Sequence, residues 1–369
     1  MNSRYHFIDN LRWVTVVLVL IYHIFYNYNA QGVFGGLGSF CAEGQWQDTI
    51  CTALYPWFMT LMFILAGASS RYALLHRSVE EFRKERVRKL LLPVTVGLFV
   101  FGWVLGVVNV TAGGGWALMP ADMPLFVKYL IACGSGTGHL WFIQDLLGFS
   151  LLLLLVRKVS DAERVDAWLL KLSERNLWLV LVTVLPLLWG VSQTHIDNPT
   201  AAQGLLNLYR PVYYFVTFLL GYYLFSSERV HNFLAKMWAW LVALAVVAGV
   251  GFCWVFYGKD YTAPDVLQGL LCNLYCWSMT LAMMGIFKRW ADKTSKFTNY
   301  MSRSSFGIYI VHMAVCSWAC WLLKGSALPL WAIYALALMA TLLGSVATYE
   351  ILHRIPFLRW AIFGIKKRR

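Results

Sequence analysis

Two ionisable side chains interrupt the first apolar stretch of the sequence, Asp9–Tyr28, which reads DNLRWVTVVLVLIYHIFYNY. Arg12 lies near one end, and His23 follows eleven residues later. In a helix, about 100° of rotation per residue brings both side chains to one face, about 16 Å apart along the axis. Ionisable groups inside a membrane span are costly and usually functional. The imidazole is therefore a candidate general base or nucleophile; the alternative is a snorkelling arginine and a histidine bonded to a neighbouring helix.

A dense group of basic residues occurs in the segment 76–93, HRSVEEFRKERVRKLLLP. This segment is expected to form an amphipathic helix that leads into an apolar run. Arg83, Arg86, Arg88 and Lys89 would then form a cationic patch at the membrane surface. Such a patch suits a polyanion such as the phosphates of coenzyme A. Its plainer interpretations are the positive-inside signal of a membrane protein and the binding of lipid headgroups.

Further polar residues gather in the stretch GHLWFIQDLLGF. On one continuous helix, His139 and Trp141 are two residues apart and would not share a face, whereas Trp141 and Asp145 are four apart and would. Asp145 is deep enough in the apolar run to need a partner, so it is expected to be either part of a site or a structural contact between helices.

Two later residues complete the set of candidates. His312, in SSFGIYIVHM, is expected about 12 Å into an apolar span, where a single histidine is more often structural than catalytic. Glu350, in TYEILHRIP, closes the last apolar run and is expected to pair with a basic group.

The composition decides which class of protein carries these residues. Hydrophobic residues make up 59% of the 369 residues and charged residues only 13%, which is typical of a polytopic membrane protein. The net charge of +13 does not indicate nucleic-acid binding, because the basic residues lie in short segments between apolar runs. One integral membrane domain over residues 1–369, entirely α-helical, is expected, since lipid requires the backbone to satisfy its own hydrogen bonds.

The apolar runs predict about ten transmembrane helices, each close to the length that crosses a bilayer. They cover approximately residues 10–28, 50–70, 93–110, 139–156, 177–193, 208–225, 238–257, 266–287, 304–323 and 330–351. If the N-terminus is cytoplasmic, the cytoplasmic segments hold 27 of the 31 Lys and Arg residues. The charge distribution therefore predicts that both termini are cytoplasmic. The long external connections, 29–49 and 111–138, are rich in Gly and aromatics and are expected either to cover an acceptor site or to be solvated linkers.

The cysteines and the remaining patterns give little evidence of other chemistry. Cys41 and Cys51 would both lie on the outer side, so a disulfide between them stays open. The sequence contains no zinc pattern, P-loop, GxGxxG motif or internal repeat, and no metal ligand set is expected.

Five segments, taken in order, resemble one family. FIDNLRWVTVVLVLIYH, an Arg followed by ten residues and a His, resembles the N-terminal signature of the acyltransferase-3 integral membrane acyltransferases. MFILAGASSRYAL with RKERVRKLLLP resembles the glycine motif and the basic segment of that family. GHLWFIQDLL, SSFGIYIVH and YEILHRIPFLR are similar to its later blocks, so that the resemblance extends over nearly the whole chain. Many members carry an Arg-x-x-Arg pair before the proline, whereas Arg86 and Lys89 occupy those positions here.

The resemblance implies transfer of an acyl group, acetyl by family default, from cytoplasmic acyl-coenzyme A to a hydroxyl of a carbohydrate or glycan at or across the membrane. It implies a multi-pass protein of the bacterial inner membrane, with acyl-coenzyme A as donor substrate and no tightly bound cofactor. The acyl chain, the acceptor and the oligomeric state are not encoded in a motif. A secondary transporter or exporter of a small polar substrate is the alternative, since it would also need intramembrane ionisable groups.

Combining resemblance and residue geometry, we expect three groups of functional residues. The catalytic group is His23, as general base or acyl-imidazole nucleophile, with His312 and Asp145 to orient it or bind acceptor. The acyl-coenzyme A group is Arg12, Arg86, Arg88 and Lys89, and the acceptor-binding or supporting group is His139, Trp141 and Glu350.

Overall fold

The computed structural model describes residues 5–29, 37, 46–159, 167, 171, 176–194 and 208–366. Within these residues every regular element is a helix and none is a strand. The predicted all-α membrane fold is therefore confirmed.

Eight helical segments are long and apolar enough to cross a membrane within the described part of the chain. They are His6–Asn27 (α1), Asp48–His76 (α2), Val79–Ala112 (α3 to α5), Gly138–Arg157 (mostly α7), Glu228–Val255 (α11), Leu270–Trp290 (α13), Lys296–Lys324 (α14) and Leu330–Arg354 (α15). Two further predicted spans coincide with shorter helices, α9 (Leu177–Ser192) and α10 (Pro211–Tyr223). All ten predicted spans thus fall on helices, while the number of crossings and the side of the termini remain predictions.

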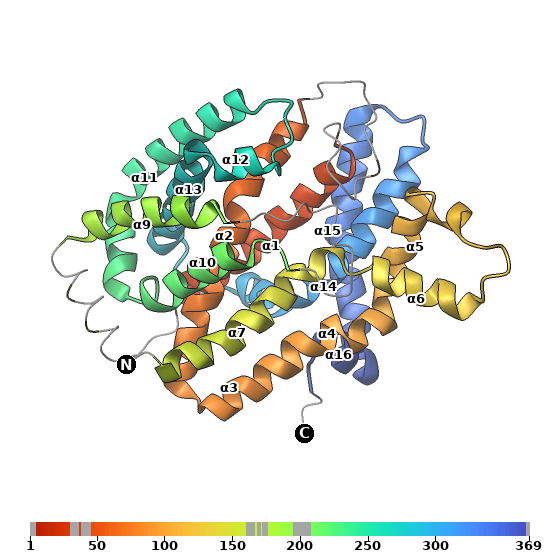
Figure 1. Ribbon diagram of the computed structural model, residues 1–369, viewed down its shortest axis with the longest axis horizontal. Coiled ribbons are helices and arrows are strands. Elements are labelled where there is room, and N and C mark those ends of the chain that lie inside the picture. The colour runs from red at the N-terminus through yellow and green to blue at the C-terminus, as the bar shows by residue number, and fades with distance from the viewer. Residues whose placement is uncertain are drawn as a thin grey trace.

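Helix α1 occupies the middle of the molecule (Figure 1). It packs against α2 and α13 on one side and against α14 and α15 on the other. Its side chains Leu11, Val16, Val19 and Leu20 are almost completely buried, which explains why this stretch is apolar on more than one face. Because of this position, side chains of α1 contact helices on both sides of the bundle.

Glycines set the close approach of α2 to α10. A Cβ atom added to Gly67 would lie 2.0 Å from the backbone oxygen of Phe218, and one added to Gly221 would lie 2.0 Å from that of Ile64. Small residues at such reciprocal positions let two membrane helices pack backbone to backbone. This contact holds the C-terminal end of α10 beside the C-terminal half of α2.

The third apolar segment is one helical rod of mixed geometry. It runs through α3 (Val79–Arg86), a π-helical turn η1 (Val87–Leu91), α4 (Leu92–Val94), a second π-helical turn η2 (Leu98–Gly102) and α5 (Trp103–Ala112). The break lies at Thr95, which has φ −120° and ψ −87° and comes two residues after Pro93, whose nitrogen has no hydrogen to donate. Interruptions of this kind often mark functional sites.

The connection that follows α5 differs from the loop predicted for 111–138. It contains a short 3₁₀ turn η3 (Gly115–Leu118) and the helix α6 (Leu125–Ser135), which packs back along α5. Gly106 permits this, because a Cβ there would lie 1.6 Å from the backbone oxygen of Ala132. The turn η4 (Gly138–Leu140) then leads into α7 (Trp141–Val159).

The remaining short helices close the bundle. α12 (Pro264–Gln268) precedes α13, and α16 (Pro356–Phe363) folds back after α15 to pack on α4 and η2. Gly364 ends α16 in the left-handed conformation at φ +63°, the usual role of a glycine after a helix.

Candidate active site

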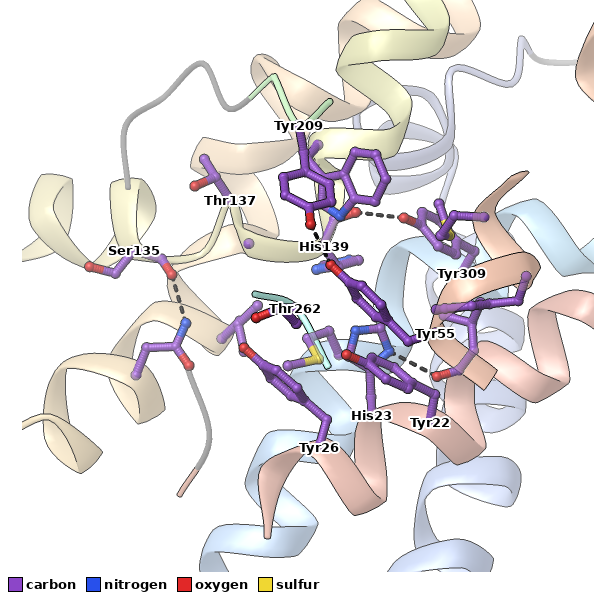
Figure 2. A pocket seen from close by; sticks show the side chains of 18 of the residues that line it. Tyr22, His23, Tyr26, Tyr55, Ser135, Thr137, His139, Tyr209, Thr262 and Tyr309 are labelled. Carbon is purple, nitrogen blue, oxygen red and sulfur yellow. Dashed lines mark hydrogen bonds between the residues drawn. The ribbon is translucent and has the colours of Figure 1, made fainter. Parts of the chain in front are cut away.

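A cavity of about 400 Å³ lies inside the bundle between α1, α2, α14 and the turn that precedes α7 (Figure 2). Its walls are mainly aromatic and hydroxyl-bearing: Val19, Tyr22, His23, Tyr26, Tyr55, Phe58, Met59, Leu105, Asn109, Ile131, Gly134, Ser135, Thr137, Gly138, His139, Trp141, Tyr209, Tyr214, Thr262, Tyr309 and Met313. None of these residues is Asp, Glu, Lys or Arg, so the described wall carries no formal charge. Several of them belong to the connection 111–138, as expected for a segment that covers a site.

His23 reaches the cavity from α1, four residues before the helix ends at Asn27. It is half-buried, and its Nδ1 atom lies 2.8 Å from the backbone oxygen of Val19 and 3.2 Å from Nε2 of His312. His312 comes from α14 and is completely buried. The structure therefore joins two histidines that are 289 residues apart in sequence and that the sequence placed on separate spans.

A third imidazole, that of His139, lies beside this pair. Its ring centroid is 5.1 Å from that of His312, and its Nε2 atom lies 2.9 Å from the backbone oxygen of Ile310. The Tyr309 hydroxyl donates to the backbone oxygen of His139 and so fastens η4 to α14 from the other direction. Two hydrogen bonds of opposite sense thus fix the turn that carries His139 against the helix that carries His312.

Backbone carbonyls assign the proton positions of the three imidazoles. A carbonyl oxygen only accepts, so the nitrogen facing it carries the hydrogen in each ring. His312 accordingly donates from Nδ1 to Tyr309, and its Nε2 accepts from the Nδ1–H of His23, which is shared with Val19. The Nε2 atom of His23 is then left with a lone pair and has no hydrogen-bond partner among the described residues. This arrangement presents a basic nitrogen to the cavity.

His139 and Trp141 both line the cavity, although the sequence predicts that they do not share a face. The two residues are not on one continuous α-helix, because His139 lies in the 3₁₀ turn η4 and Trp141 begins α7. Asp145, predicted to share a face with Trp141, does not line the cavity.

Asp145 lies apart from the histidines. It is almost completely buried on α7, where its oxygens form no hydrogen bond of good geometry among the described residues and the backbone of Tyr209 is the hydrogen-bonding group that faces it. The structure therefore does not bring this carboxylate to His23 or His312, and its predicted catalytic role gains no support from geometry.

Phenolic hydroxyls also line the cavity. The hydroxyls of Tyr55 and Tyr209 are 2.6 Å apart (Figure 2). The Tyr22 hydroxyl lies 3.2 Å from that of Tyr261, which does not itself line the cavity. The Trp141 indole packs edge-on against Tyr209, with ring centroids 5.4 Å apart. Sequence reasoning missed these tyrosines because they come from elements that are distant in the chain. Their one signal is the unusual number of tyrosines inside apolar runs.

Arg12 and Arg86 meet at the other end of the bundle, on the C-terminal part of α2. Arg12 donates to the hydroxyl of Ser69, at 2.5 Å, and lies 3.2 Å from the carboxylate of Asp9. Arg86 donates to the hydroxyl of the next residue, Ser70, at 3.1 Å. The two guanidinium groups, predicted to belong to one cationic cluster, are therefore bound to adjacent residues of a third helix.

The other two predicted donor-binding residues have different surroundings. The Nε atom of Arg88 donates to the backbone oxygen of Gly364 at 3.1 Å and so ties η1 to the end of α16. Lys89 forms an ion pair with Glu85 at 2.6 Å and remains half-exposed. Its single ammonium group makes a point contact rather than the two-pronged contact of an arginine.

Glu350 lies away from the cavity on α15. Its carboxylate accepts from the Tyr300 hydroxyl at 2.8 Å and lies 3.9 Å from the Arg354 guanidinium. The predicted pairing with a nearby basic group is thus present, but it is a wide and exposed contact worth little stability.

No group of three or more His, Cys, Asp or Glu residues suited to a metal occurs among the described residues. Cys51 is buried, and its thiol faces the backbone oxygen of Tyr22 at 3.7 Å. Cys41 lies outside the described residues, so their pairing stays a prediction.

Comparison with known protein families shows which family the chain belongs to. A family model described as an acyltransferase domain matches residues 5–350, which is nearly the whole sequence. The chain belongs to the acyltransferase-3 family. Searches of curated proteins and of solved structures each found no match. Membership shows an acyltransferase, and together with the apolar helices it shows a multi-pass membrane protein.

Proposed function

We propose that this acyltransferase moves an acyl group from acyl-coenzyme A to a carbohydrate hydroxyl, with His23 as the general base. The observation that carries the proposal is the His23–His312 pair at the cavity wall, which leaves Nε2 of His23 directed at the space where an acceptor would bind. We further propose that the protein resides in a bacterial inner membrane, with both termini in the cytoplasm.

The chemistry follows from the proton positions. As the acceptor oxygen attacks the thioester carbonyl carbon, His23 Nε2 takes the hydroxyl proton, and the resulting imidazolium keeps its Nδ1–H on His312 and Val19. The carbon–sulfur bond then breaks, and the same proton passes from Nε2 to the leaving thiolate, which departs as free coenzyme A. His312 is a positioning residue in this scheme, since it touches the base rather than the substrate. In the alternative reaction order, His23 first carries the acyl group as an acyl-imidazole, and this order also needs His23 and His312.

The acceptor proposal rests on the character of the cavity wall. A sugar ring offers apolar C–H faces and a rim of hydroxyls, and the wall offers Trp141 and tyrosine rings together with Asn109, Thr137 and Thr262. Aromatic faces and neutral hydrogen-bonding groups are the complement of such a ring. A neutral carbohydrate is therefore preferred over an anionic one in the part of the cavity that is described.

The donor proposal rests on Arg12 and Arg86. Their two cationic groups, held on adjacent serines of α2, suit the phosphates of coenzyme A. Arg12 and His23 lie eleven residues apart on one helix, about 16 Å along the axis. Thr15 and Val16 lie between them and are buried. The long arm of coenzyme A that carries the thioester can therefore reach His23 only if the helices around α1 separate.

The test is His23→Gln in purified, reconstituted protein with acetyl-coenzyme A and three probe acceptors, the methyl glycosides of glucose, galactose and mannose. Glutamine keeps the hydrogen-bonding capacity and approximate size of histidine but neither accepts a proton near neutral pH nor carries an acyl group. Coenzyme A release should fall roughly 10²–10⁴-fold, the usual contribution of a general base. The melting temperature and the affinity for free coenzyme A should stay at wild-type values.

Two results would contradict the proposal. Activity close to wild type in His23→Gln would make the histidine a packing residue. Wild-type protein that neither binds coenzyme A nor acylates any of the three glycosides would remove the proposed donor and acceptor together.

A further inference from the structure

A second, smaller cavity adjoins the first on the side of the interrupted third segment. This side cavity has a volume of about 20 Å³. It is lined by Pro93, Gly97, Leu98, Phe101, Gly102, Leu105, Gly136, His139, Leu140, Ile310, Ala314 and Ile362. Leu105 and His139 line both cavities, so the side cavity lies next to the histidine cluster.

The lining of the side cavity is apolar apart from the His139 ring. Gly97, Gly102 and Gly136 lie in this wall, and a Cβ atom at Gly136 would come within 2.0 Å of the backbone oxygen of Gly102, so the glycines let the segments around the space pack closely. Nδ1 of His139 is buried and has no hydrogen-bond partner among the described residues, and the rest of the lining side chains suit an apolar group. The volume of the side cavity corresponds to about one water-sized group, which is the size of a methyl group.

The far end of the side cavity is closed by α16. A Cβ atom added to Gly97 would lie 3.0 Å from the backbone oxygen of Ala361 and 3.3 Å from Cα of Ile362. Ile362 is almost completely buried there. The described residues therefore leave no room for the space to lengthen in that direction without moving α16.

We propose that the side cavity holds the terminal carbon of the acyl group while the thioester carbonyl faces His23, and that its small size restricts the donor to acetyl. This inference rests on the proposed function. A two-carbon group places one methyl beyond the carbonyl, which matches the available volume. Each further methylene needs space that Ile310, Leu98 and Ile362 occupy.

Ile310 and Ile308 provide a matched pair for the test. Both lie on α14 and both are buried, at 5% and 3% exposure, but only Ile310 lines the side cavity. Ile310→Ala removes three carbons from the cavity wall and keeps the backbone oxygen that accepts from His139. Ile308→Ala removes the same three carbons from a buried site elsewhere on the helix.

The full chain is solubilised in detergent, and the dissociation constants of free, acetyl-, propionyl- and butyryl-coenzyme A are measured. This binding measurement requires no acceptor. Wild type should bind acetyl-coenzyme A more tightly than the butyryl form. In Ile310→Ala the ratio of butyryl to acetyl affinity should rise about tenfold, because each newly buried methylene contributes roughly fivefold or less. Ile308→Ala should keep the wild-type ratio.

A filling variant gives the opposite change. Ala314→Val places two carbons in the side cavity, so acetyl-coenzyme A should lose affinity while free coenzyme A, which has no acyl group, keeps it. Ala282→Val, at a buried alanine of α13 that lines neither cavity, is the control for overpacking.

The outcomes separate the two proposals. Unchanged chain-length ratios in both Ile310→Ala and Ala314→Val, with coenzyme A still bound, would overturn the side-cavity inference and leave the proposed function intact. Failure of every form of coenzyme A to bind wild type would overturn the proposed function, and this inference with it.

Discussion

The two ends of α1 present different chemistry. At the end that carries His23, the surroundings are neutral and aromatic, and they are assembled from α1, α2, α14 and the connections before α7 and α10. At the end that carries Arg12, two cations lie against serines of one helix. The first end is suited to proton transfer on an uncharged acceptor, and the second to holding an anion. One helix therefore separates binding of charge from chemistry at a neutral site.

This separation has a physical reason. A carboxylate or cation close to His23 would change the charge of its imidazole, whereas a neutral partner such as His312 fixes the ring without adding charge. Phosphates need charge-assisted contacts, which are less costly near the membrane surface than in its interior. The variants below change one end at a time.

The largest effect at the cavity end, after removal of His23, is expected for His312→Gln. Glutamine still offers an acceptor to His23, but its flexible side chain holds that acceptor less rigidly than the imidazole ring does, so kcat should fall on the order of 10–10²-fold. The KM for donor should be almost unchanged, since the charged end is intact. Steady-state kinetics that separate kcat from KM measure this. A loss equal to or greater than that of His23→Gln would move the base to α14.

At the charged end, Arg86→Ala should weaken binding of free coenzyme A by roughly 1–3 kcal/mol, the value of one charge-assisted contact. Titration calorimetry in detergent measures the affinity directly. Because Arg86 does not line the cavity, kcat at saturating donor should remain near wild type.

Arg88→Ala is the matched control on the same segment. Its guanidinium is occupied by the backbone oxygen of Gly364, so the variant should lower the melting temperature and change donor affinity less than Arg86→Ala does. A larger loss of affinity in Arg88→Ala would restore this residue to the donor site and remove Arg86 from it.

The smallest effect is expected for Asp145→Asn. Asparagine keeps the shape and removes a carboxylate that touches neither the cavity nor a histidine, so kcat should change less than a few-fold. Its free energy of unfolding should stay close to that of wild type, because asparagine keeps a polar group of nearly the same size and shape at this buried position. Measured kcat together with a denaturation curve tests both statements. A hundredfold loss of kcat at unchanged stability would place Asp145 in the mechanism after all.

The sequence by itself determined the class, the helices and most of the chemistry. Apolar runs of bilayer length leave the backbone little choice but helix, so all ten predicted spans coincide with helices. The spacing of Arg12 and His23 is a property of one helix, and helical periodicity is local. For that reason their shared face and their separation of about 16 Å along the helix could be predicted before any packing was known.

Only the tertiary structure decided which residues meet. The contact between His23 and His312 depends on how α1 packs on α14, and nothing in either segment specifies it. The shared wall of His139 and Trp141 depends on a 3₁₀ turn, and the isolation of Asp145 depends on which face of α7 that turn leaves inside. Both cavities exist where glycines and bulky aromatics from distant elements fail to fill space, which is a property of packing and not of spacing along the chain.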